Sequence, residues 1–408
     1  MSNIILINIK GPNLIGLSHN LYSQIAELDV HLIDISHSLL EKQVSLEIIV
    51  QLSKDPREKL IGLLQQKCGP LGLDITVREI EQNEAQQTIP ITKQSSAAQE
   101  NYILTLLTHQ ISAQEIAHIA QITEKHGLDI LQITRLSSQS AIDSSSSNVE
   151  TSCLEFTLHG IAIDLDKIRA SLLELAAQFD IDIAIQKSDA IRLDRRLVCF
   201  DMDSTLIKAE VIDELAKRAG VGNQVSAITE RAMQGELDFS ASFKERLALL
   251  KGLDETVLRE VAEQLPMMEG VETLMRNLKA RGFKTAILSG GFSYFGNYLQ
   301  DKLGFDYVHA NTLEVIDGCL SGRVVEPIID GARKAALLEE IAKHEKLTLQ
   351  QTVAVGDGAN DLPMLNKAGL GIAFRAKPLV RKSAKHSIST HGLDGVLYIL
   401  GFSGSNII

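Results

Sequence analysis

The sequence lacks paired cysteines and long apolar runs, and each absence excludes a class of protein. Its four cysteines are scattered, without the spacing of a zinc or redox site, which indicates a reducing compartment. No segment approaches the length of a membrane span, and the apolar run at the N-terminus is too short for a signal peptide. We therefore expect a cytoplasmic protein with no membrane partner.

The sequence also has little positive charge. It has 40 basic and 52 acidic residues, for a net charge of −12, and the basic residues form no dense cluster. A nucleic-acid surface would need such a cluster, so we expect no nucleic-acid partner. A small anionic substrate would have to be held by a few local cations and a metal ion.

The length and composition are those of an ordinary globular protein. With 408 residues, 45% of them apolar and 23% charged, the chain can bury a full core. This length predicts roughly two to four domains.

The first half of the chain carries one order of predicted elements twice. The first copy contains a strand at 3–10 that ends at Gly11, a helix at 14–28, strands at 29–39 and 43–52, a helix ending at Cys68 and a strand at 72–80. The second copy contains a strand at 102–108, a helix at 112–126, strands at 128–136 and 153–159, a helix at 164–179 and a strand at 181–187. This βαββαβ order is the ferredoxin-like plan. We predict two such domains, 1–82 and 100–188, joined by a polar linker.

The second half, 190–408, shows apolar strands alternating with longer helices, which predicts a doubly wound parallel sheet of the α/β class. About 80 residues separate the strand at 197–202 from the next one, Lys284–Leu288, far more than a crossover needs. We interpret residues 208–268 as an inserted helical cap over the carboxyl edge of the sheet. Ligands bind at that edge in open α/β sheets.

Two carboxylates stand at the end of the first of these strands. If the strand continues through them, Asp201 and Asp203 point to the same side. Buried acidic groups repel each other, and a divalent ion with oxygen ligands would relieve the repulsion. The alternative is a simple strand-to-loop turn, because Asp, Ser and Thr are good helix N-caps.

Three further stretches repeat this theme of polar groups at element ends. Ser289-Gly290-Gly291 follows a strand and is expected to open a helix, where a hydroxyl and free N–H groups form a phosphate cradle. Lys334 stands near the start of a helix predicted over 331–345. Gly356 to Asp361 follows a strand and supplies acidic and amide groups that suit a metal, although Asn and Asp also cap turns.

Together, these four stretches occur in the order of the haloacid dehalogenase superfamily motifs, and the chain resembles that superfamily over about 195–375. Just beyond the first motif stands Glu210, and the predicted cap contains Phe239 and Ser242-Phe243-Lys244-Glu245-Arg246. Together with the two N-terminal units, these residues resemble the phosphoserine phosphatase family. Both N-terminal units resemble ACT regulatory domains. The resemblance implies a haloacid dehalogenase-like fold with a helical cap, preceded by two ACT-like domains.

The resemblance assigns the chemistry to particular residues. Asp201 would be the nucleophile that forms an aspartyl-phosphate. Asp203 would protonate the leaving seryl oxygen and later activate water. Mg²⁺ would be bound by the Asp201 carboxylate, the Asp203 backbone carbonyl and Asp357, with Asp361 and Asn360 orienting these ligands.

It also implies how the substrate is held. Ser289, the Gly290 N–H and Lys334 would neutralise charge on the phosphoryl oxygens. The cap would recognise the amino acid: Glu210 its ammonium, Arg246 its carboxylate in a directional fork, and Phe239 by shaping the pocket. The structural alternatives are a helix-dipole contact for Glu210, a solvated helix face for Arg246 and the cap core for Phe239.

The implied activity is Mg²⁺-dependent hydrolysis of O-phospho-L-serine, the last step of serine biosynthesis. Gly11-Pro12-Asn13 sits where ACT domains place a turn that would hold an amino-acid effector, whereas the second copy has no glycine there. A scaffold or a homodimer surface is the alternative for both units. Two other functions stay open: a phosphatase of another small phosphomonoester, and an amino-acid sensor with an inert phosphatase domain.

Overall fold

The computed structural model describes residues 3–14, 16–26, 30–40, 43–52, 57–80, 101–137, 151–160, 164–188, 190–233 and 236–408. The predicted linker at 82–100 lies outside these residues. The chain divides into two compact units: 1–190 with 398–407, and 191–397 with 408.

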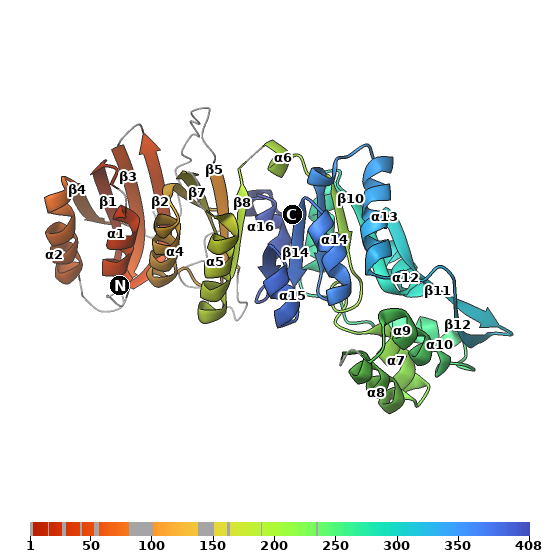
Figure 1. The fold of residues 1–408 in the computed structure, drawn as a ribbon. Helices are drawn as coiled ribbons and strands as arrows, with labels where there is room; N and C mark the ends of the chain where they lie inside the picture. Colours follow the sequence, from red (N-terminus) through yellow and green to blue (C-terminus); the bar gives the residue numbers. More distant parts are fainter. Residues whose placement is uncertain are drawn as a thin grey trace. The chain divides into compact units, whose positions relative to one another are not determined.

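The first unit is one eight-stranded sheet with helices on one face (Figure 1). Its elements are β1 (Asn3–Pro12), α1 (Leu17–Ala26), β2 (Val30–Leu40), β3 (Gln43–Leu52), α2 (Arg57–Cys68), β4 (Asp74–Glu79), β5 (Asn101–Thr108), α4 (Ala113–Lys125), β6 (Leu128–Arg135), β7 (Ser152–Gly160), α5 (Leu165–Phe179) and β8 (Asp182–Lys187). Alternate residues along the strands are buried, as in β3, and form a hydrophobic core that includes residues of both copies.

The strand order shows how the two copies join. It is β4-β1-β3-β2-β6-β7-β5-β8, so each copy has the same internal order and the second strands meet in the middle. β2 and β6 run antiparallel, with His37 opposite Ile133. The predicted ferredoxin-like duplication is therefore confirmed, and the two copies pair within one chain.

The second unit contains a seven-stranded sheet and a cap. Its elements are α6 (Ala190–Leu193), β9 (Leu197–Phe200), α7 (Val211–Arg218), α8 (Gly222–Met233), α9 (Phe239–Ala248), α10 (Thr256–Gln264), α11 (Val271–Ala280), β10 (Lys284–Phe292), α12 (Ser293–Leu303), β11 (Tyr307–Ile316), β12 (Cys319–Val325), α13 (Gly331–His344), β13 (Thr352–Gly356), α14 (Leu362–Lys367), β14 (Leu370–Phe374), α15 (Pro378–Ser383), β15 (His386–Ile388) and α16 (Gly395–Ile399).

The central strand β9 lies between β10 and β13, in the order β12-β11-β10-β9-β13-β14-β15. All pairs are parallel except β11 with β12. Every residue of β9 is buried, as expected for a parallel strand covered on both faces. The α/β fold predicted from the alternating pattern is therefore confirmed.

The helices α7 to α10 form the cap, and two sets of backbone hydrogen bonds attach it to the sheet domain (Figure 1). At its base, Lys208 N–H donates to Pro266 O at 2.8 Å, and Met268 N–H to Leu206 O at 2.9 Å. Farther out, the β11–β12 hairpin joins the cap where Gly252 N–H donates to Leu320 O at 2.8 Å. These bonds fix the cap at two places.

Several element boundaries differ from the prediction. β1 does not stop at Gly11, because Gly11 and Pro12 still pair with β3. β9 ends at Phe200 and not at residue 202. β10 continues through Ser289-Gly290-Gly291, so this stretch does not open a helix, and α12 begins at Ser293. At the ends of β1 and β10 the sequence leaves the boundary open, because glycine fits extended and turn backbone equally well.

Among the described residues, no helix combines the length and the apolarity that a membrane crossing requires. All four cysteines are free thiols.

Candidate active site

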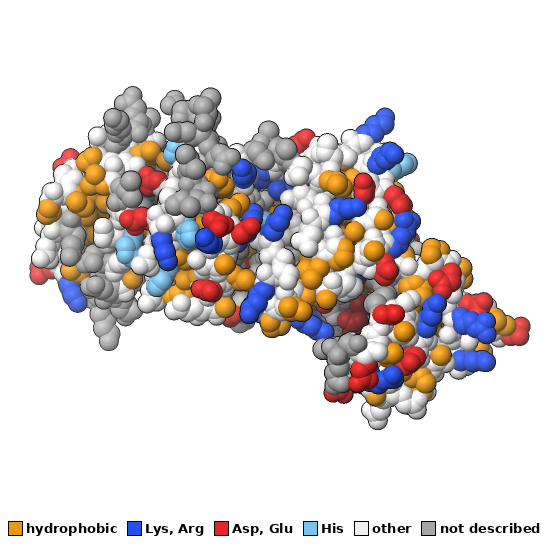
Figure 2. All heavy atoms as spheres, viewed as in Figure 1, with side chains coloured by type: hydrophobic (Ala, Val, Ile, Leu, Met, Phe, Trp, Pro, Cys, Tyr) orange, Lys and Arg blue, Asp and Glu red, His pale blue; other side chains and the backbone are white. Residues whose placement is uncertain are grey.

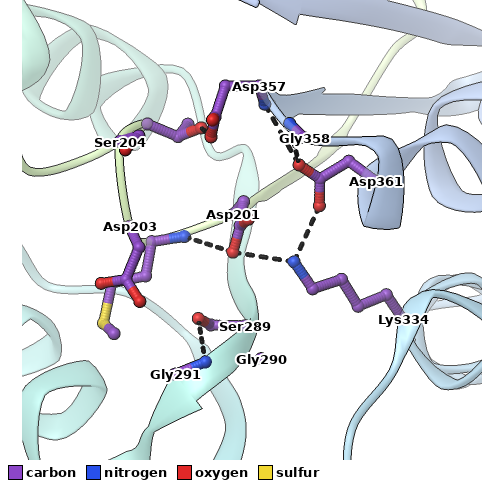
Figure 3. Close-up of polar contacts among 12 residues, drawn as sticks. Asp201, Asp203, Ser204, Ser289, Gly290, Gly291, Lys334, Asp357, Gly358 and Asp361 are labelled. Carbon is purple, nitrogen blue, oxygen red and sulfur yellow. Dashed lines mark hydrogen bonds and ion pairs between the residues drawn. The ribbon is translucent and has the colours of Figure 1, made fainter. Parts of the chain in front are cut away.

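The central strands deliver acidic residues to the carboxyl edge of the sheet. Phe200 of β9 is paired with Val355 of β13, and Asp201 N–H donates to Val355 O at 2.9 Å. Asp201 and Asp357 therefore emerge side by side from adjacent strands, as Figure 3 shows. Parallel pairing explains why residues 156 positions apart in the sequence meet here.

A buried lysine connects two of these carboxylates. Lys334 Nζ from α13 lies 2.8 Å from Asp201 Oδ1 and 2.7 Å from Asp361 Oδ1 (Figure 3). Burial by itself would lower the pKa of Lys334, but the two negative charges outweigh it and raise that pKa above its ordinary value. Removing either partner of such a buried pair would leave an uncompensated charge, which is costly. Lys334 is therefore a fixed cation behind Asp201.

Asp361 is held at both carboxylate oxygens. Oδ1 binds Lys334, and Oδ2 accepts the N–H groups of Asp357 and Gly358 at 3.1 and 2.9 Å. There is no room for a side chain at Gly356, where a Cβ would lie 2.5 Å from the Asp361 carboxyl carbon. These bonds fix the turn that presents Asp357.

Three carboxylates form a candidate metal site. One oxygen each of Asp201, Asp357 and Asp361 lies within 4.8 Å of the others. Burial, followed by the charges of Asp201 and Asp361, raises the pKa of Asp357 to about 8, although Thr205 donates to its Oδ1 at 3.0 Å. This unfavourable crowding of oxygens fits a hard divalent cation. Since the oxygens of Asp361 are already bonded, Asp201 and Asp357 are the better placed ligands.

Asp203 has different neighbours from Asp201. It points towards Ser289 and Gly291, away from Asp357 (Figure 3), and its Oδ1 accepts Val211 N–H at 3.3 Å. Removal from water raises its pKa well above the ordinary value, and the charges of Glu210 and Asp201 raise it further. This carboxyl group is therefore suited to carry a proton near neutral pH.

The Ser289-Gly290-Gly291 stretch lies opposite these acids. The Ser289 side chain is buried, and its Oγ accepts Gly291 N–H at 2.9 Å. A Cβ on Gly291 would lie 2.7 Å from Met202 Cε and 2.8 Å from Asp203 Oδ2. Only glycine fits here without displacing the acid.

A cavity of about 140 Å³ lies between the sheet edge and the cap. It is lined by Asp201, Asp203, Glu210, Val211, Ile212, Phe243, Arg246, Ser289, Gly290, Gly291, Phe292, Asp357 and Asn360. Figure 2 shows acidic side chains recessed in the hollow beside the cap. Its size suits a small molecule, and one wall is polar while Phe243 and Phe292, with ring centres 5.9 Å apart, form part of another.

The cap places one acidic and one basic group in this cavity. Glu210 precedes α7 and accepts a hydrogen bond from Ser204 Oγ at 2.8 Å. Arg246 of α9 is half-buried, and its Nε lies 3.4 Å from the carbonyl oxygen of Ser242. Opposite charges at the cap side are able to bind a zwitterion.

Most of the residues predicted from the sequence meet at this cavity. Asp201, Asp203, Glu210, Arg246, Ser289, Gly290, Asp357 and Asn360 line it, while Lys334 and Asp361 support Asp201 from behind. Phe239 begins α9, but its side chain is not among those that the structure describes. The cavity also contains Val211 and Ile212, which had not been singled out.

The predicted effector stretch belongs to the first unit. Gly11 and Pro12 end β1, and Asn13 donates from Nδ2 to Asp129 Oδ2 of the second copy at 2.8 Å. A Cβ on Gly11 would lie 2.9 Å from Gly72 O. The stretch is therefore closely packed and touches both copies.

The comparisons with known proteins agree with this geometry. A model of haloacid dehalogenase-like hydrolases matches residues 195–369, and an ACT domain model matches 3–78. A phosphoserine phosphatase of Streptomyces coelicolor is 36% identical, covering 99% of this chain and 93% of that protein. Phosphoserine phosphatase SerB2 of Mycobacterium tuberculosis is 35% identical, with coverages of 99% and 94%.

A solved structure is similar as well. It is a haloacid dehalogenase family hydrolase of Salmonella enterica serovar Typhi, with a TM-score of 0.64 and 34% sequence identity. The match covers 74% of this chain and 98% of that one.

Proposed function

The chain belongs to the phosphoserine phosphatase family of haloacid dehalogenase-like hydrolases, and from this membership we propose that it hydrolyses O-phospho-L-serine to L-serine and phosphate. The reaction completes serine biosynthesis. The observation that carries the proposal is the cavity itself, which has a nucleophile–lysine pair at one end and charges of both signs at the other.

Asp201 is the proposed nucleophile. Its Oδ1 is oriented by Lys334 and by the Met202 N–H at 2.7 Å. Attack by the carboxylate on phosphorus forms an aspartyl-phosphate and breaks the bond between phosphorus and the seryl oxygen. Orientation of this kind removes much of the entropic part of the barrier.

Asp203 is the proposed general acid and base. Its raised pKa keeps a proton available for the leaving seryl oxygen. The carboxylate that remains then takes a proton from the water that hydrolyses the aspartyl-phosphate. Because Asp203 Oδ1 accepts the N–H of Val211, the first residue of the cap helix α7, the leaving group would lie on the cap side of the phosphoryl group.

Mg²⁺ is the proposed metal. The Asp201 and Asp357 carboxylates and the Asp203 backbone carbonyl would hold it, with Asp361 and Asn360 orienting these ligands. When bound, the ion supplies positive charge that offsets the negative charge of the phosphoryl oxygens. The crowded oxygens of Asp201, Asp357 and Asp361 support this assignment.

Ser289, the Gly290 N–H and Lys334 are the proposed phosphoryl-binding groups. They supply donors and a positive charge on the side of the cavity opposite the cap, which is typical of phosphoryl-transfer sites. Lys334 is already fixed by two carboxylates, so its charge needs little reorganisation during the reaction.

The cap is proposed to bind the serine moiety of the substrate. Glu210 would bind the ammonium group and Arg246 the carboxylate, and Phe239 would shape the pocket. An arginine fork is directional, so it selects for a carboxylate at a defined distance from the phosphoryl group. The position of Glu210 and Arg246 in one cavity supports this division.

The remaining proposals concern regulation and location. An amino-acid effector would bind near Gly11, Pro12 and Asn13, where the ACT-like copies touch. A homodimer stays a prediction, as do the domain boundaries 1–82, 100–188 and 190–408. Four free cysteines support a reducing, cytoplasmic location.

Phosphate release from a panel of phosphorylated small molecules, with and without Mg²⁺, tests the proposed function. We expect Mg²⁺-dependent release from O-phosphoserine well above that from other esters, and none from Asp201→Asn. Preference for another ester would contradict the substrate. Equal release by wild type and Asp201→Asn would favour an amino-acid sensor, and addition of free L-serine tests the effector proposal.

A further inference from the structure

One buried amide outside the cavity connects the end of strand β10 with the segment that precedes α13. Asn311 of β11 is 1% exposed, and both ends of its amide are bonded. Its Nδ2 donates to the Gly290 carbonyl oxygen at 2.8 Å, and its Oδ1 accepts the Ile329 N–H at 2.8 Å. A buried amide with all its bonds to backbone fixes the distance between the segments that it joins.

The first bond compensates for a break in the sheet. β10 pairs with β11 up to Leu288 opposite His309, and the register then shifts before Phe292 opposite Asn311. Within that shift, Ser289-Gly290-Gly291 leaves the regular ladder and lines the cavity. A carbonyl removed from the ladder still needs a donor, and the side chain of Asn311 supplies it at Gly290.

The second bond fixes the start of α13. Ile329 precedes Asp330, whose side chain caps this helix by accepting Arg333 N–H at 2.8 Å. The backbone N–H of Lys334 donates to Asp330 O at 2.9 Å. A Cβ on Gly331 would lie 2.4 Å from Asn360 O, so this segment also packs closely against the acidic turn.

We propose that Asn311 is a positioning residue that sets the distance between the Gly290 turn and the helix that carries Lys334. The inference rests on the proposed function, in which both of these groups bind phosphoryl oxygens. Asn311 itself touches neither the cavity nor, on this account, the substrate. Its effect is therefore on the phosphoryl end of the substrate and not on the amino-acid end.

Two substitutions separate the bonds. Asn311→Asp keeps the shape and the acceptor for Ile329, but in its ionised form it cannot donate to Gly290. Asn311→Leu removes both bonds. The matched control is Asn277→Asp on α11, because Asn277 is also fully buried and its Nδ2 donates to the carbonyls of Thr273 and Ile408. It lies outside the cavity.

We expect kcat/KM of Asn311→Asp to fall roughly 10- to 100-fold, the usual loss for a group that orients an active-site residue. The fall should be equal for O-phosphoserine and p-nitrophenyl phosphate, because both carry the same phosphoryl group. Orthovanadate binding, measured by calorimetry, should weaken by a similar factor. Asn277→Asp should lower thermal stability and leave these values unchanged.

Two results would overturn the inference. One is a folded Asn311→Asp protein with unchanged kinetics and vanadate affinity, which would give the residue a role in stability alone. The other is a loss confined to O-phosphoserine. If Asn311→Leu does not fold, Asn311→Asp decides. A wild-type chain that fails with O-phosphoserine counts against the proposed function, while the vanadate comparison still tests Asn311.

Discussion

Asp201 and Asp203 are two positions apart, yet their surroundings differ in charge. Asp201 is paired with the Lys334 ammonium, whereas burial and then the charges of Glu210 and Asp201 raise the pKa of Asp203. Removal from water and these anions favour the protonated form of Asp203, while the ammonium of Lys334 holds the Asp201 carboxylate in place. The same residue type thereby serves as nucleophile and as acid, which is the division of roles that the proposed reaction needs.

At the residue scale, Arg246→Ala tests recognition of the serine carboxylate. Loss of a charge-assisted fork costs about 2–3 kcal/mol, so kcat/KM for O-phosphoserine should fall about 30- to 150-fold. Activity on p-nitrophenyl phosphate, which lacks the carboxylate, should change little. Arg259→Ala, at an exposed position of α10, is the control. Equal losses on both esters would show that Arg246 acts on the phosphoryl group or on the fold.

Asp357→Asn tests the electrostatic repulsion among the clustered carboxylates of Asp201, Asp357 and Asp361. Because burial and like charges raise the pKa of Asp357 from 3.8 to about 8, ionisation of this group favours the unfolded chain, and the metal-free protein loses stability as the pH rises from about 4 to 8. The amide should therefore raise the free energy of unfolding of the metal-free protein by about 1–3 kcal/mol, and with it the melting temperature. It should also abolish activity. Scanning calorimetry in chelator and in Mg²⁺ measures both states.

In that experiment, Mg²⁺ should stabilise the wild-type protein and have little effect on Asp357→Asn. Asp317→Asn, in the exposed turn of the β11–β12 hairpin, makes the same chemical change outside the cluster and should behave as wild type. A metal-free variant less stable than wild type would contradict the proposed repulsion.

His37 provides a prediction in the first unit. It is 2% exposed, neither ring nitrogen has a hydrogen-bond partner among the described residues, and burial lowers its pKa to about 4 from 6.5. Between these values the unfolded chain binds more protons than the folded one, so stability falls as the pH falls from 6.5 to 4. The full loss is about 3 kcal/mol.

His37→Leu should remove this part of the pH dependence, while His109→Leu, at an exposed position, should keep it. Pulse proteolysis in urea, with cleavage followed within residues 1–190, measures the midpoint at pH 7 and pH 5. An identical pH dependence in wild type and His37→Leu would contradict the assignment.

At the scale of elements, the site depends on where strands stop. β9 and β13 end at the cavity, but β10 continues past its regular pairing as Ser289-Gly290-Gly291. The sequence predicted the first two ends to within two residues, because apolar runs stop near acidic residues. It could not predict the third, because Asn311, which satisfies the displaced Gly290 carbonyl, lies on another strand and leaves no local signal.

Gly291→Ala tests the close packing of Gly291 against Met202 and Asp203. The added methyl group would lie within 2.8 Å of both Met202 Cε and Asp203 Oδ2, so the acid or the turn must move. We expect kcat to fall by about 100-fold, because displacements of about 1 Å at a reacting group have this effect. Gly222→Ala is the control, since the nearest atom to its Cβ would be 3.9 Å away. A Gly291→Ala enzyme with full activity would contradict the account of this turn.

At the scale of the whole molecule, alternating patterns predicted both folds, but not the pairing within them. The βαββαβ order was readable twice, because apolar periodicity is local. The junction of β2 with β6 was not, because pairing between distant strands leaves no mark in either segment. The same reasoning explains why the hydrogen bond from Thr205 to Asp357 was not predicted. Thr205 stands within the first acidic motif, but it meets Asp357 only because β9 and β13 are adjacent in the sheet.

The central claim is that Asp201 carries the phosphoryl group during turnover. The direct measurement mixes Mg²⁺-loaded protein with O-phosphoserine, quenches the mixture with acid and maps the modified peptide by mass spectrometry. We predict one phosphoryl group on Asp201 in the wild-type protein and none in Asp201→Asn. A phosphoryl group on a different residue, or turnover by Asp201→Asn at the wild-type rate, would contradict the account.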